Sequence, residues 1–174
     1  MNNRQIEVMI IGPTNLGPYH LARFNALADA GLTLTVVQTP ISEFHRPWKL
    51  DADQAHFQIE RPYEANGTRV GWRELIGCTQ KYLARKSPQA VICVGYNSRY
   101  IWAMSISGRR LGIPVVLSLV GWEKERRRTW IKEIVKRFYC RYCFDAALVT
   151  GTRAAAYAQR LGVDMARIWK VGNV

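Results

Sequence analysis

The sequence has few acidic residues and few histidines. Its 174 residues include 13 Asp and Glu against 25 Lys and Arg, so the formal net charge is +12, and only 3 residues are histidine. His45 and His56 fall in a stretch broken by prolines, which leaves His20 as the one histidine near a predicted helix. No Ser/His/Asp or Cys/His set can be assembled from these residues, so catalysis by an activated nucleophile is not indicated.

Cysteines and long apolar runs are also scarce. Cys140 and Cys143 form a C-x2-C pair, but no second Cys or His pair follows at the spacing of a zinc site. We therefore expect reduced thiols and no metal. The polar start of the chain is followed by an apolar run, Val8 to Ile11, that is far shorter than the about 20 residues of a membrane span. These absences predict a cytoplasmic protein.

What remains is the composition of an ordinary globular domain. Hydrophobic residues make up 48% of the chain and charged residues 22%. This content and length exclude a disordered chain, a collagen and a miniature disulfide scaffold, and they suit one domain over residues 1–174.

Apolar, β-branched runs alternate with segments of helical periodicity along nearly the whole chain. Residues 39–67 interrupt this rhythm with a polar, proline-containing excursion. The alternation predicts a doubly wound, mostly parallel α/β domain of the Rossmann-like kind. The expected strands are 6–11, 32–37, 57–59, 90–94, 115–120, 146–149 and 168–171, and the expected helices are 19–30, 72–86, 100–111, 129–143 and 152–161.

Ligands of such sheets bind at the carboxyl ends of the strands, so four loops are candidates. The first, Gly12 to Gly17, lacks the Lys-Ser/Thr of a Walker A motif and is not G-x-G-x-x-G. It is either a tight turn or a glycine loop that lets a ligand approach backbone N–H groups. Both interpretations stay open. The other three loops begin at Gly95, Gly121 and Gly151.

The positive charge is concentrated between Lys124 and Arg141, where eight basic residues stand against two acidic ones. One helical face of this segment is apolar, and we expect it to pack on the sheet. The basic face would then be exposed to anionic phosphates or acidic lipid headgroups. No nucleic-acid recognition motif accompanies it, so we expect no nucleic-acid partner. The residues expected to contact an anionic membrane surface are Arg127, Arg128, Lys132 and Lys136.

Several segments, taken in order, resemble a known family. They are Pro114 to Glu123, the basic helix, Asp145 to Gly151, Tyr157, Leu161-Gly162-Val163, Ile168 and Val171-Gly172-Asn173-Val174. Together with the early glycine turn and Val94-Gly95-Tyr96-Asn97, this set is similar to the amino-terminal half of group-1 (family 4) glycosyltransferases.

The resemblance implies a two-domain GT-B enzyme that retains anomeric configuration. Its first domain holds mainly the acceptor, and its second holds most of the nucleotide-sugar site. We therefore expect this chain to be the acceptor-binding domain, to end at the interdomain linker, to carry no cofactor and to transfer no sugar alone. The implied enzyme builds a cell-surface glycan or glycolipid at the inner membrane face. The implied acceptor residues are Gly12, Asn15, Gly17, Pro18, His20, Tyr96, Asn97, Gly121, Trp122, Arg126 and Gly151.

One departure from the family concerns the end of the strand at 115–120. Many members carry a histidine there, whereas this chain has Gly121-Trp122-Glu123, which matches a Gly-x-Asp/Glu variant. Glu123 is therefore the candidate catalytic residue, expected to accept hydrogen bonds from substrate hydroxyls. The alternative to this family is a stand-alone nucleotide-binding or regulatory α/β module that docks an anionic partner through the basic helix.

Overall fold

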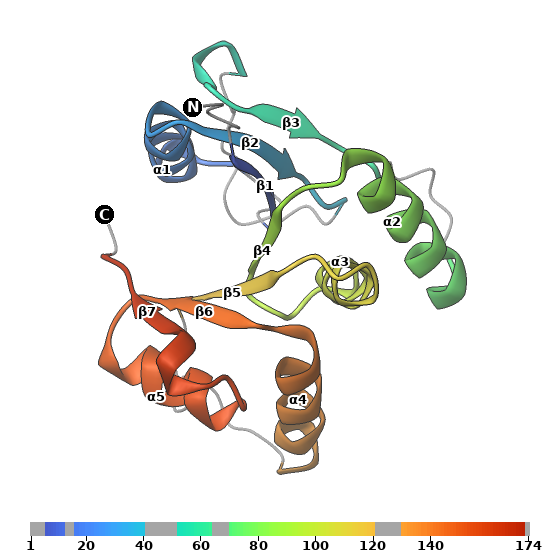
Figure 1. Cartoon of the computed structure of the whole chain (residues 1–174), viewed down its shortest axis with the longest axis vertical. Coiled ribbons are helices and arrows are strands. Elements are labelled where there is room, and N and C mark those ends of the chain that lie inside the picture. The colour runs from blue at the N-terminus through green and yellow to red at the C-terminus, as the bar shows by residue number, and fades with distance from the viewer. Residues whose placement is uncertain (1–5, 13–15, 41–51, 64–69, 121–129, 173–174) are drawn as a thin grey trace.

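The computed structural model describes residues 6–12, 16–40, 52–63, 70–120 and 130–172, without the side chains of Trp130 and Lys132. Within these ranges it contains a single seven-stranded sheet in the order β3-β2-β1-β4-β5-β6-β7 (Figure 1). Every pair of neighbouring strands is parallel. The strands are β1 (Ile6–Ile11), β2 (Leu32–Val37), β3 (Gln58–Glu60), β4 (Ala90–Val94), β5 (Val115–Leu119), β6 (Ala146–Val149) and β7 (Ile168–Lys170).

In the described part of the chain, five α-helices and two short 3-10 turns connect the strands. The helices are α1 (Pro18–Asp29), α2 (Trp72–Lys86), α3 (Arg99–Arg110), α4 (Trp130–Cys143) and α5 (Thr152–Arg160), and the turns are η1 (Ala52–Gln54) and η3 (Met165–Arg167). The prediction of a doubly wound parallel domain is confirmed, and each boundary differs from the expected one by no more than one residue. Helices and strands alternate because each parallel pair needs a crossover, which here is a helix in most cases.

The two faces of the sheet are covered unequally. Helix α1 packs on one face through Phe24, which lies in a cluster with Val8, Ile10, Leu34 and Val36. Helices α2 to α5 pack on the other face, over a larger cluster that runs from Met9 to Val163. The strands alternate between these clusters because successive side chains point to opposite faces.

Part of the α1 face has no helix over it among the described residues. Ile92 on β4, Val116 on β5 and Leu148 on β6 are only half-buried there. The register pairs Leu148 with Trp169 of β7, whose side chain is 53% exposed. Sheets that are all parallel are normally covered on both faces, so this half of the face is a surface suited to contact with another element.

Helix α4 corrects one expectation from the sequence. Its inward face consists of Tyr139, Cys140 and Cys143, which are buried against α3 and the sheet. Its apolar face points outward: Ile131, Ile134, Val135, Phe138 and Tyr142 are 44–73% exposed. The prediction that the apolar face packs on the sheet is wrong. The inner face of α4 packs against α3 without these five side chains, because the Tyr139 ring stacks on Trp102 with centroids 3.9 Å apart and an angle of 5° between the ring planes.

Candidate functional site

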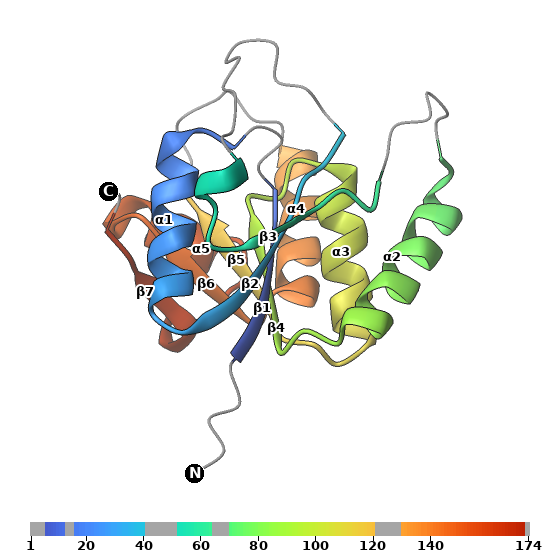
Figure 2. The ribbon, with the colours of Figure 1, turned by 90° about the horizontal axis from the view of Figure 1, so that it is seen from above.

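The carboxyl ends of the strands meet at one edge, where the order of strands reverses between β1 and β4. Figure 2 shows the starts of α1, α2 and α3 gathered at this end of the sheet. In open α/β sheets this reversal is the usual place of ligand binding. The loops after β1, β4, β5 and β6 therefore form the candidate site, within the part of the chain that the structure describes.

Gly12 directly follows β1, at the point where the order of strands reverses. Its φ is +147°, and a Cβ at this position would lie 2.7 Å from the Cβ of Val94 at the end of β4. Any side chain would therefore push β1 and β4 apart. This supports the interpretation of a tight turn, while the possibility of ligand approach to the loop stays a prediction.

The first turn of α1 is fixed by its own side chains. The backbone N–H of Gly17 donates to Nδ1 of His20 over 3.4 Å, so His20 closes the amino terminus of the helix. Pro18 occupies the first helical position, where its missing N–H costs nothing. Arg23 donates to the hydroxyl of Tyr19 over 2.6 Å, and its guanidinium lies 5.2 Å from the centre of that ring.

The loop after β4 holds one buried and one exposed candidate. Tyr96 is buried, its hydroxyl lies 2.8 Å from that of Tyr157, and its carbonyl accepts from the indole of Trp102 over 2.7 Å. Its contacts are therefore to the protein interior. Asn97 follows Tyr96 in the same loop and is exposed.

A chain of polar side chains leads from Tyr96 into the helical layer. The hydroxyl of Tyr157 on α5 donates to Oε2 of Glu133 on α4 over 3.4 Å. Oε1 of Glu133 accepts from Nζ of Lys136 over 3.0 Å, and that Nζ lies 5.6 Å from the centre of the Tyr96 ring. Lys136 thus turns toward the interior, in contrast to the exposed basic face that the sequence predicted for it.

Gly151 begins α5 with a φ of +135°, a conformation that favours glycine. Just before it, the backbone N–H of Thr150 donates to the carbonyl of Leu119 over 3.4 Å. The Thr150 hydroxyl donates to the carbonyl of Val120 over 3.5 Å. These bonds hold the ends of β5 and β6 together.

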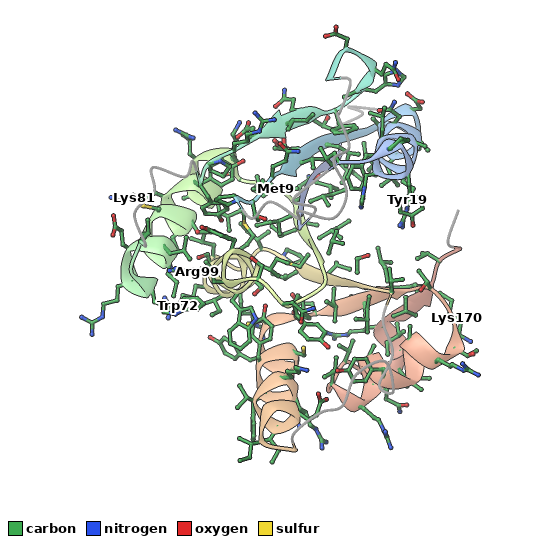
Figure 3. The ribbon with its side chains drawn as sticks, turned by 180° about the vertical axis from the view of Figure 1, so that it is seen from behind. Met9, Tyr19, Trp72, Lys81, Arg99 and Lys170 are labelled. Carbon is green, nitrogen blue, oxygen red and sulfur yellow. The ribbon has the colours of Figure 1, made fainter. Side chains whose placement is uncertain are left out.

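Two residues near this end of the sheet, Arg99 and Thr39, were not predicted as site residues from the sequence. Arg99 begins α3, and its guanidinium lies 5.4 Å from the Trp72 ring and 6.0 Å from the Tyr100 ring (Figure 3). It donates to the carbonyl of Val70, while its Nε has no hydrogen-bond partner among the described residues. The buried hydroxyl of Thr39, just after β2, also has none in that part of the chain. Only their position next to predicted strand ends could have indicated them.

Several predicted site residues lie outside the described residues, and their roles stay predictions. They are Asn15, Gly121, Trp122, Glu123, Arg126, Arg127 and Arg128. The side chain of Lys132 is also outside the described part.

The inner thiols of α4 do not resemble nucleophiles or metal ligands. Burial raises the pKa of Cys140 to about 12 and that of Cys143 to about 11, so both are protonated at neutral pH. Within the described ranges no three His, Cys, Asp or Glu residues are grouped as a metal site would require.

Comparison with known proteins shows the fold. No family model and no curated protein matches the chain. A UDP-N-acetylglucosamine 2-epimerase from Rickettsia bellii has a TM-score of 0.65 at 19% identity, and the match covers 98% of this chain and 45% of the epimerase. HepE from Anabaena, solved with UDP and glucose, has a TM-score of 0.68 at 10% identity, covering 97% of this chain and 44% of HepE. MurG from Acinetobacter baumannii has a TM-score of 0.58 at 15% identity, covering 97% and 46%.

The chain has the fold of one GT-B domain. It spans under half the length of these structures. None of the helices in the described ranges has the length and hydropathy needed to cross a membrane.

Proposed function

We propose that this chain is the acceptor-binding domain of a retaining glycosyltransferase that uses a nucleotide sugar. In this proposal a second domain binds the donor, and the acceptor is a glycan or glycolipid of a cell-surface polymer. The observation that carries the proposal is the extent of the structural likeness. An epimerase named for UDP-N-acetylglucosamine and HepE, solved with UDP and glucose, each match nearly all of this chain, yet the chain spans less than half of each.

The half-covered sheet face supports a partner domain. Ile92, Val116 and Leu148 form an apolar surface beside α1, and Trp169 extends it to the edge of the sheet. Burial of such a surface against a second domain, supplied by the same polypeptide or by a separate subunit, would complete the two-sided cover that parallel sheets have.

The candidate residues would act by positioning. In our proposal Asn97 and Glu123 hold acceptor or donor hydroxyls at the carboxyl edge, while Gly12 and Gly151 keep the strand ends close together. The guanidinium of Arg99, held by Trp72, would add a fixed positive charge next to the developing negative charge of the leaving diphosphate. Retaining transfer of this kind needs orientation and charge stabilisation more than a strong general base.

The experiment is a donor screen with the polypeptide as it occurs in its native source. An antibody to this chain would recover it, its intact mass would be measured, and transfer from radiolabelled UDP-glucose and UDP-N-acetylglucosamine to membrane extracts would be followed. We expect label to enter the acceptor fraction, a mass about twice 19.9 kDa or a second subunit, and no transfer by the 174-residue chain alone. Consumption of no nucleotide sugar by the native protein would contradict the proposal.

A matched pair of variants tests the assigned site. Glu123→Ala should lower kcat/KM for transfer by at least about tenfold, because a positioning contact is lost. Glu125→Ala, two residues away, removes the same charge and should change kcat/KM for transfer little. Equal effects of the two variants would show that Glu123 is not a site residue.

Epimerisation is a second candidate reaction, because epimerases are among the matching structures. The acceptor distinguishes the two reactions. A transferase releases nucleotide only when an acceptor is present, whereas an epimerase converts the donor without one. Acceptor-independent conversion of UDP-N-acetylglucosamine would therefore favour the epimerase.

A further inference from the structure

The outer side of α4 carries a continuous stripe of large apolar side chains. Ile131, Val135, Phe138 and Tyr142 are spaced by four, three and four residues, and Ile134 lies beside them. Such spacing places all five on one side of a helix. Their side chains are 58%, 51%, 73%, 58% and 44% exposed, respectively. Figure 1 shows α4 between α3 and α5 with its far side turned away from the sheet.

This stripe differs from scattered surface apolar residues. Other exposed large apolar side chains in the described ranges, such as Leu27, Leu111 and Met165, stand singly on different elements. Isolated cases of that kind are normal, whereas a contiguous apolar patch marks an interaction surface. Phe138, which belongs to the stripe, has the largest exposed fraction of the exposed large apolar side chains in the described ranges.

Positive charge borders the stripe. Arg137 and Arg141 are exposed and follow Ile134 around the helix on one side. Arg137 also lines a hollow of about 290 Å³ between α4 and α5, together with Ile134, Tyr157, Arg160 and Glu133. Glu133, which also lines this hollow, is ion-paired with Lys136.

We propose that the outer side of α4 binds the surface of a bilayer that contains anionic lipids. The five apolar side chains enter the boundary between headgroups and acyl chains, with the helix parallel to the membrane plane. Arg137, Arg141 and Arg160 contact anionic headgroups at the rim. Tyr142 suits the same boundary, since an aromatic ring with a hydroxyl is stable where an apolar and an aqueous phase meet.

Charge decides between a bilayer and a second copy of this chain. The formal net charge of +12 disfavours self-association and favours an anionic surface. This inference stands on α4 alone and does not depend on the proposed reaction.

The test is flotation of the chain with vesicles of equal parts phosphatidylglycerol and phosphatidylcholine, against vesicles of phosphatidylcholine alone. We expect strong binding to the anionic vesicles, weak binding to the neutral ones, and partial loss with rising salt. The double variant Val135→Asp/Phe138→Asp should lower partitioning by about tenfold or more. Met165→Asp, at an apolar side chain that is also 53% exposed but lies on η3, is the matched control and should bind normally.

A second pair of variants separates charge from apolar insertion. Arg137→Gln/Arg141→Gln should lower binding to anionic vesicles by roughly tenfold and leave binding to neutral vesicles unchanged. Lys81→Gln/Arg110→Gln removes the same charge from exposed positions on α2 and α3 and should have a smaller effect. Circular dichroism of each variant would verify its fold.

Four outcomes would overturn the proposal or its anionic-lipid part. The first is no binding to either vesicle, and the second is equal loss in Val135→Asp/Phe138→Asp and in Met165→Asp. The third is a dimer in sedimentation without lipid that Val135→Asp/Phe138→Asp converts to monomer while vesicle binding is absent, which would assign the stripe to a second copy. Equal binding to neutral and anionic vesicles would overturn the role of anionic lipid.

Discussion

Helices α3 and α4 lie side by side on the same face of the sheet, yet they present their apolar residues in opposite directions. In α3 the buried positions include Ile101, Ala103 and Met104, so its apolar side faces the core. In α4 the large aliphatic side chains and Phe138 face outward, and the core receives one tyrosine and two cysteines. Amphipathic periodicity therefore identifies the two sides of a helix without stating which side is buried.

The largest expected effect contrasts the two helices directly. Met104 is fully buried, and Met104→Ala should lower the free energy of unfolding by about 2–5 kcal/mol through lost transfer energy and a residual cavity. Phe138→Ala removes a larger side chain. It should change the free energy of unfolding by no more than about 0.5 kcal/mol, because the Phe138 side chain is already exposed to solvent in the folded protein. Urea unfolding followed by circular dichroism measures both. A loss of several kcal/mol in Phe138→Ala would mean that its side chain packs in the core.

A smaller effect concerns the contact that joins the two helices. The hydroxyl of Tyr139 on α4 lies 2.8 Å from that of Ser105 on α3, and the Ser105 hydroxyl also donates to the carbonyl of Trp102 over 3.1 Å. Tyr139→Phe keeps the stacked ring and removes one buried hydrogen bond, so we expect a loss of about 1 kcal/mol. The exposed Tyr142, changed to Phe, is the matched control and should be neutral.

A double-mutant cycle with Ser105→Ala sharpens this result. If the two hydroxyls interact as the structure has them, the losses of Tyr139→Phe and Ser105→Ala should not add. Additive losses would show that the α3–α4 contact rests on ring stacking alone.

The order of elements could be predicted from the sequence because its causes are local. Runs such as Val115 to Leu119 are β-branched and apolar, and glycines at 31, 112 and 162 end helices with positive φ. The sequence leaves the loop at Gly12 open between a tight turn and a glycine loop for a ligand, and the steric need for glycine depends on the contact with Val94 of β4. That contact joins residues far apart in the chain, so no local pattern contains it.

The orientation of α4 and the contacts of the candidate site could not be predicted for the same reason. Tyr96 was expected at the acceptor, yet its hydroxyl meets Tyr157 in the interior, a pairing that depends on how α5 packs. Arg99 and Trp72 are 27 positions apart, and they meet because α2 and α3 both begin at the carboxyl edge of the sheet. The order of strands is contained in local patterns, whereas packing between helices decides which side chains meet at the carboxyl ends of the strands.

The smallest expected effect distinguishes Lys136 from its neighbour Arg137 on α4. Lys136 and Glu133 form an ion pair with side chains 26% and 29% exposed, so Lys136→Gln should cost about 0.2–1 kcal/mol of unfolding free energy, less at high salt. In this variant Glu133 still accepts a hydrogen bond from the hydroxyl of Tyr157, which limits the loss of unfolding free energy. Arg137→Gln, one position along the helix, should leave stability unchanged and weaken vesicle binding, whereas Lys136→Gln should leave vesicle binding nearly intact. If Lys136→Gln instead weakened vesicle binding as much as Arg137→Gln, the membrane would contact the basic face expected from the sequence, and the apolar stripe would need another partner.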